Sequence, residues 1–288
     1  MQTNYLIPSI IKLFTRVEYY KGYINHFDHD IMHYSKNLLE QLKNAKILKE
    51  NDLIQIKGSR LVINDLTGEG EKGWEIFPLP TEGYRVSSMD YVEKNQDLIQ
   101  FVSLTLFSQS YEALESYFKD ILTLYFMNNN QIAFETIGKI NCVRKSKKID
   151  WEITVRKLKT GSNNSELLNI FRNLSLEFTH SEKTNNRNIN LAKWYKVISI
   201  SRHSTTHSNS IINSDVYNRL DHNERNILSY FFDIKMLNDR TKKITLSVNK
   251  ASELLELICE YSFLIFKCLS KSNNLDWKIL VNMNKQNA

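Results

Sequence analysis

Residues 199–210 read SISRHSTTHSNS and place an arginine and two histidines inside an otherwise apolar region. Apolar residues precede and follow this stretch, whereas Ile200 is the only apolar residue within it. A guanidinium binds phosphate oxygens through paired hydrogen bonds. An imidazole accepts or donates a proton near neutral pH. These residue types therefore suit chemistry on a phosphate group.

The spacing of these side chains favours a shared helical face. At 100° per residue, Arg202 and Thr206 lie on one line along a helix, and His203 and His207 lie on the adjacent line. Small hydroxylated residues beside them permit the close approach of another helix. A bundle helix with such a polar centre loses stability, which a function or a specific interface would explain.

Other interpretations of this stretch remain open. The arginine and histidines would also suit a buried network that braces a bundle, or a dimer contact without catalysis. His203 and His207 match the spacing of two zinc ligands on one helix. However, Ser204 stands where the H-E-x-x-H motif has glutamate, no third ligand is evident, and Arg202 would repel a divalent ion. We therefore expect no metal and no other cofactor.

A second group of histidines and aspartates lies near the N-terminus. We interpret it as a solvated helix start, with metal binding as the alternative. Its members are His26, Asp28, His29, Asp30 and His33.

The second part of the chain is expected to be helical. All three prolines and six of the eight glycines precede residue 85, and these residues interrupt regular structure most strongly. Apolar residues recur at helical spacing over 97–126. Further helices are expected over 131–145, 165–179, 189–213, 222–238 and 249–271. Asp221 or Asn223 would cap the fifth of these six helices, and Asn249 or Ser252 the last.

The first part of the chain is expected to be mixed. Apolar periodicity predicts helices over 5–20 and 30–46, and alternation predicts a hairpin over 53–63 with an extra strand near 74–77. A turn-rich connection follows, with a domain boundary between 85 and 97. We expect two domains: residues 1–95 as a small mixed α/β domain of unknown role, and residues 96–288 as a helical bundle in a mainly α protein.

The sequence R-H-x3-H at Arg202, His203 and His207 resembles the R-x4-H motif of the HEPN superfamily of helical ribonucleases and nucleotide-binding domains. The motif lies on a late helix with a further long helix after it. The opening helix, SQSYEALESYFKDIL, is similar to the acidic and aromatic first helix of these domains. The resemblance covers roughly residues 97–271, and Ser208 stands where a small residue or glycine often follows the motif histidine.

The resemblance implies a metal-independent endoribonuclease that leaves a 2′,3′-cyclic phosphate. His207 would act as general acid/base, Arg202 as phosphate clamp and His203 as auxiliary contact. Glu115 would orient Arg202 across the bundle. The alternative for Glu112, Glu115 and Lys119, spaced i, i+3, i+7, is a solvent-facing set of charges.

The resemblance also implies partners. A five-residue offset places Arg202 and His207 about 140° apart on one helix, which fits a homodimer with a composite active site. RNA is the expected substrate, and an antitoxin or other regulatory protein is a possible partner in a bacterial toxin or phage-defence setting. The competing interpretation is a non-catalytic module that binds RNA or nucleotide, or regulates through dimerisation.

The charge distribution agrees with an anionic partner. Residues 1–95 contain 12 Lys/Arg and 13 Asp/Glu, whereas residues 96–288 contain 26 and 19. Eight basic side chains lie within 139–160, where they would attract a polyanion or form a solvated loop. The residues assigned to RNA binding are Thr206, Lys145, Lys147 and Lys148.

The remaining composition favours a cytoplasmic protein. The N-terminus lacks the pattern of a secretory signal, and no apolar run is long enough to span a membrane. The three cysteines, Cys142, Cys259 and Cys268, show no zinc-like spacing and are interpreted as small core residues in a reducing compartment.

Overall fold

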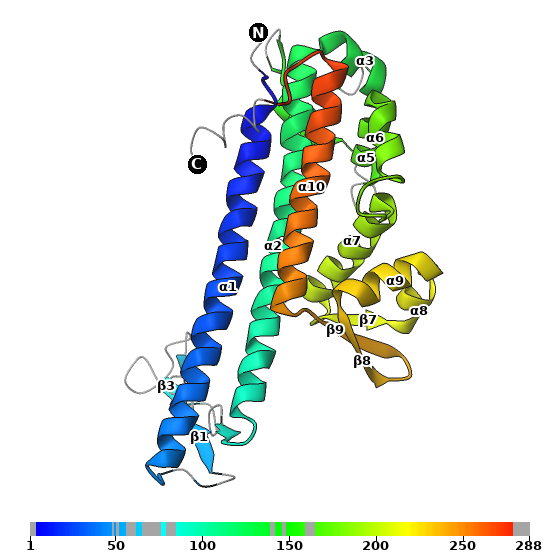
Figure 1. Cartoon of the computed structure of the whole chain (residues 1–288). Coiled ribbons are helices and arrows are strands. Elements are labelled where there is room, and N and C mark those ends of the chain that lie inside the picture. The colour runs from blue at the N-terminus through cyan, green and yellow to red at the C-terminus, as the bar shows by residue number, and fades with distance from the viewer. Residues whose placement is uncertain are drawn as a thin grey trace. The chain divides into compact units, whose positions relative to one another are not determined.

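The computed structural model shows a mainly α protein (Figure 1). It describes residues 4–47, 49, 52–55, 62–64, 76–78, 85–138, 142–145, 148–158 and 165–278. No described helix combines the length and hydropathy needed to cross a membrane.

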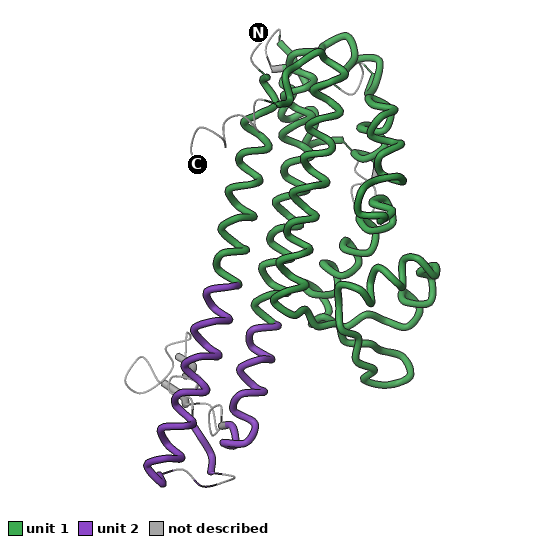
Figure 2. Tube along the Cα trace, in the orientation of Figure 1, with its two compact units in different colours: residues 1–24, 101–288 green, residues 25–100 purple. Residues whose placement is uncertain are grey.

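The chain divides into two compact units (Figure 2). One unit combines Met1–Ile24 with Phe101–Ala288, and the other consists of Asn25–Gln100. This division differs from the linear division expected at residue 95, because the first 24 residues pack with the second part of the chain.

A single long helix, α1 (Ile7–Asn44), replaces the two helices expected over 5–20 and 30–46. The residues between them contain no proline, and a side chain added at Gly22 would meet nothing within 4 Å. Ile24 is buried and continues the apolar stripe of Leu13 and Val17. Nothing in this segment therefore ends the helix.

The unit formed by Asn25–Gln100 contains two antiparallel strand pairs. β1 (Leu53–Gln55) pairs with β4 (Arg85–Ser87), and β2 (Val62–Asn64) pairs with β3 (Ile76–Pro78). The strand expected near 74–77 is confirmed, but the hairpin expected over 53–63 is wrong. Alternation of apolar and polar residues indicates a strand, but it does not show which other strand pairs with it. Here Leu39, Val86 and Tyr91 form a small hydrophobic core. The strand hydrogen-bonded to β1 is β4 and not β2.

Three long helices form the centre of the larger unit: α2 (Tyr91–Asn128), α7 (Leu191–His207) and α10 (Val248–Ser272). The Tyr117 hydroxyl donates to the Ser262 carbonyl at 2.8 Å and joins α2 to α10. Shorter helices surround them: α3 (Asn130–Ile137), α4 (Trp151–Lys157), α5 (Ser165–Leu174), α6 (Leu176–Ser181), α8 (Ser214–Asn218) and α9 (His222–Phe231).

Several helices end earlier than the spacing of apolar residues predicts. The helix expected over 131–145 ends at Ile137, before Gly138 with its φ of 75°. The helix expected over 165–179 breaks at Ser175, whose side chain caps α6 by accepting from the Phe178 N–H. The helix expected over 222–238 ends at Phe231.

Short strands lie within and between the segments expected to be helical. β5 (Arg144–Lys145) pairs with β6 (Lys148–Ile149). A three-stranded sheet has the order β7 (Ile211–Asn213), β9 (Thr241–Thr245), β8 (Asp233–Asn238). The sequence predicts none of these five strands. The apolar residues of β8 also fit a helix, and β5 and β6 are only two residues long.

Two lysines of α7 bind the first turn of α9. Asp221 caps α9 as expected, and its side chain forms a capping box with Glu224. Lys193 donates to Asp221 at 2.7 Å and lowers the pKa of its carboxyl, and Lys196 donates to both oxygens of the buried Glu224.

The cap expected for α10 is wrong, because Ser247 occupies the N-cap position.

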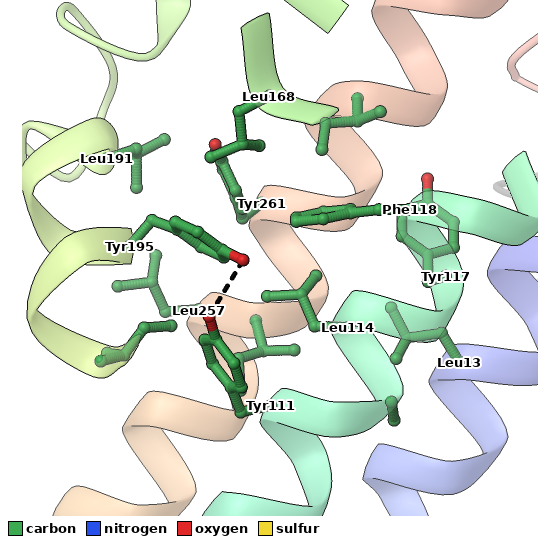
Figure 3. Close-up of a cluster of buried hydrophobic side chains, with 14 of the residues drawn as sticks. Leu13, Tyr111, Leu114, Tyr117, Phe118, Leu168, Leu191, Tyr195, Leu257 and Tyr261 are labelled. Atoms are coloured by element: carbon green, nitrogen blue, oxygen red, sulfur yellow. Dashed lines mark hydrogen bonds between the residues drawn. The ribbon is translucent and has the colours of Figure 1, made fainter. Parts of the chain in front are cut away.

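Aromatic side chains fill the space between α2, α7 and α10 (Figure 3). The Tyr111 hydroxyl donates to the Tyr195 hydroxyl at 3.0 Å, and their rings stack with centroids 5.6 Å apart. Tyr261 packs against both Tyr195 and Phe118. Burial raises the pKa of these three tyrosines above its usual range, so their hydroxyls stay neutral donors.

The cysteines follow the expected pattern only in part. Cys268 is buried, whereas Cys142 and Cys259 are half-buried, and all three are free thiols. Burial raises the pKa of Cys259 to about 12 and that of Cys268 to about 11. Both therefore remain thiols, the unreactive form, near neutral pH.

A buried carboxylate joins three helices of this unit. Only 2% of the Glu182 side chain, directly after α6, is exposed. Arg172 of α5 donates to it twice, at 2.6 and 3.1 Å, and the Tyr261 hydroxyl of α10 donates at 2.6 Å. The buried charge of Glu182 is therefore matched by an opposite charge and three hydrogen bonds, as burial requires.

We expect Glu182→Gln to reduce the free energy of unfolding by about 2–3 kcal/mol, because it leaves Arg172 without its partner charge. Urea denaturation measures this change. Glu177→Gln is the matched control, since Glu177 of α6 pairs with Lys271 but is 45% exposed. Its cost should stay below about 1 kcal/mol. Equal effects of the two substitutions would contradict the role given to burial.

Candidate functional site

The stretch 199–210 is the end of a helix rather than its centre. α7 begins at the Asn190 cap, which accepts from the Lys193 N–H, and ends at His207. Asn209 and Ser210 then adopt φ values of 49° and 64°. The N–H groups of Ser208 and Ser210 both donate to the Ser204 carbonyl. The helix expected over 189–213 is therefore too long, because this turn leads into β7.

Three hydroxyl groups on the inner side of this stretch are satisfied within the helix. Ser201, Ser204 and Thr205 each donate to the carbonyl four residues earlier, at 2.9–3.0 Å. Such bonds let small polar side chains enter a core without unpaired donors. This explains how the buried Ser201 and Ser204 replace apolar residues here.

Arg202 faces α2 and pairs with a carboxylate there. Its Nη2 donates to Glu112 Oε1 at 2.8 Å, and 25% of the arginine side chain is exposed. Its Nε is buried and makes no hydrogen bond within the described residues. The guanidinium thus keeps one donor unused in a partly desolvated position.

The partner of Arg202 corrects the sequence-based expectation, which gave this role to Glu115. Glu115 instead lies beside Tyr111. Its charge, after burial, is the second cause of the raised pKa of that tyrosine. Glu112 and Glu115 are three residues apart, so periodicity alone does not say which of them faces α7.

Both histidines are exposed on the last turns of α7. The His203 and His207 ring centroids lie 4.8 Å apart, with an angle of 45° between the ring planes. Thr206 is also exposed, and its hydroxyl donates to the Arg202 and His203 carbonyls at 3.0 and 3.3 Å. The two imidazoles therefore form one accessible pair, displaced around the helix from the guanidinium.

Lys148, the one lysine assigned to RNA binding whose side chain is described, lies apart from this pair. Lys148 is exposed on β6 opposite Lys145 of β5; Lys147 and the Lys145 side chain lie outside the described residues. Trp151, just after β6, packs on Phe126. Phe126 is about 21 Å along α2 from Glu112 at 1.5 Å per residue. The structure therefore separates this basic hairpin from Arg202.

The N-terminal histidines lie on the exposed surface of α1. His26 and His29 each approach Asp30 at 3.3 Å, and His33 contacts Asn37 at 2.9 Å. Among the described residues, no three His, Cys, Asp or Glu side chains come together as a group that would hold a metal ion.

Comparison with known proteins adds no relative. No family model matches the chain, and neither a curated protein nor a solved structure matches it.

A double-mutant cycle tests the pairing of Arg202. We expect Arg202→Ala and Glu112→Ala to couple by about 0.5–1 kcal/mol in the free energy of unfolding, as a half-exposed ion pair should. The matched cycle with Glu115→Ala should be additive within about 0.3–0.5 kcal/mol. Stronger coupling to Glu115 than to Glu112 would contradict the geometry.

Proposed function

We propose that this chain is a HEPN-type, metal-independent endoribonuclease that cuts RNA through attack by the ribose 2′-hydroxyl. The observation that carries the proposal is the exposure of His203 and His207 within one turn of a partly desolvated guanidinium. The proposal places it in a bacterial toxin or phage-defence setting, in the cytoplasm, with an antitoxin or other regulatory protein as a possible partner.

The residue types supply the groups that this reaction needs. The 2′-oxygen attacks the phosphorus, the bond from phosphorus to the 5′-oxygen breaks, and a 2′,3′-cyclic phosphate and a 5′-hydroxyl remain. His207 removes the 2′ proton or delivers one to the leaving oxygen. Arg202 neutralises charge on the phosphorane, and His203 and Thr206 contact the substrate from the same helix.

A second copy of the chain would complete the site. Within one chain, Arg202 is directed toward Glu112 on α2, whereas His207 lies at the exposed end of α7. A homodimer would bring the guanidinium of one copy to the imidazole of the other. Glu112 would hold Arg202 in position, as Glu115 was first expected to do.

The ion pair also favours a second candidate function. If Glu112 occupies Arg202 permanently, the same face would bind RNA or a nucleotide, or mediate dimerisation, without cleavage. The exposed histidines would then be contact residues only.

The direct test is RNA cleavage by the purified full chain in excess EDTA. We expect single-stranded RNA to be cut to 2′,3′-cyclic phosphate ends. Arg202→Ala and His207→Ala should each lower the rate by about 10²-fold or more. His222→Ala is the control, because His222 is exposed on α9 and its ring contacts Asn226 of the same helix. Cleavage at the wild-type rate by both site variants would refute the assignment.

Mixing the inactive variants tests the composite site. Arg202→Ala chains retain His207, and His207→Ala chains retain Arg202, so a mixed dimer has one complete guanidinium and imidazole set. We expect co-refolded mixtures to regain cleavage that neither variant shows alone. Folding is checked for each variant by circular dichroism. A mixture that stays inactive although mixed dimers form would place both groups within one chain.

A further inference from the structure

His203 and His207 are arranged as a chelating pair. They lie four residues apart on α7, both are exposed, and their ring centroids are 4.8 Å apart. Two imidazoles that share one ion at bonds of about 2.0–2.1 Å, with a roughly tetrahedral angle between them, have centroids about 5 Å apart. The observed separation therefore already suits bidentate binding of a divalent transition-metal ion.

The other histidine pair with the same spacing is less suitable. His29 and His33 are 5.8 Å apart and stack at 10°, so their ring planes are nearly parallel. His29 also contacts Asp30, and His33 contacts Asn37 through Nε2. Competing contacts and greater separation make this pair a natural control for the pair on α7.

The charges around His203 and His207 permit a cation. Arg202 alone would repel a metal ion, but its guanidinium is paired with Glu112 on α2. Lys196, two turns earlier on the same exposed face as His203, is paired with Glu224. Both histidines also lie at the C-terminal end of a 17-residue helix, where the helix dipole favours positive charge.

We propose that His203 and His207 reversibly chelate a divalent transition-metal ion such as Zn²⁺, and that the bound ion inhibits the site. No third protein ligand comes near among the described residues, so water would complete the coordination and the ion would exchange. The ion is thus an inhibitor and not a cofactor. An imidazole that coordinates a metal through its free nitrogen no longer transfers a proton there. This consequence rests on the proposed ribonuclease function, whereas the binding itself does not.

Calorimetric titration of the EDTA-treated and desalted full chain with Zn²⁺ tests the binding. We expect His203→Gln and His207→Gln each to raise the Kd by about tenfold or more, and the double variant to lose this binding event. The His29→Gln/His33→Gln variant should keep it. Absence of binding to the wild type, or an unchanged Kd in the His203→Gln/His207→Gln variant, would overturn the proposal.

The inhibitory part is tested on RNA cleavage by the wild type and the His29→Gln/His33→Gln control. Zn²⁺ should slow both with a half-effect near the Kd from calorimetry, and EDTA should restore the rate. Undiminished cleavage with the site saturated overturns the inhibition. Binding through the two histidines in a chain that cuts no RNA supports the metal site and refutes the proposed function.

Discussion

The hydrogen bond between two tyrosine hydroxyls sets how α7 packs on α2. Tyr111 and Tyr195 are both buried, and each hydroxyl would lose a partner if α7 rotated or shifted along α2. The stacking of their rings, and the packing of Tyr261 against them, restrict the same motion. Because Arg202 lies two turns after Tyr195 on the same line of α7, this constraint directs its guanidinium to Glu112. The same rotation leaves His203 and His207 exposed.

Buried polar groups of this bundle are of two kinds: some are fully bonded, whereas others, among them the indole Nε1 of Trp194, have no partner in the described chain. The Glu182 carboxylate is surrounded by donors from Arg172 and Tyr261, and Ser201 and Ser204 of α7 bond to their own helix. By contrast, the Nε of Arg202 is buried without a partner in the described chain. Because 25% of the Arg202 side chain is exposed, its guanidinium remains accessible to a ligand.

The sequence predicted the class of fold and the position of the polar face, but not the partners of its residues. Apolar periodicity located α10 and the core of α2, and residue type narrowed the cap of α9 to Asp221 or Asn223, of which Asp221 is confirmed. The strands near 211–213 and 233–245 were missed, since a run such as Asp233–Asn238 fits either period. Whether Glu112 or Glu115 pairs with Arg202 depends on the rotation of α2 about its axis. That rotation is set by contacts between residues that are distant in the sequence.

The lysines of α7 have a consequence for how the two helices form. Asp221 and Glu224 make up the capping box of α9, and each also binds a lysine of α7. The carboxylates in the first turn of α9 are therefore neutralised only when α7 lies beside them. We expect α7 and α9 to fold together in one cooperative step. Because Lys193 and Lys196 are partly exposed, ionic strength tunes this step while leaving the aromatic core untouched.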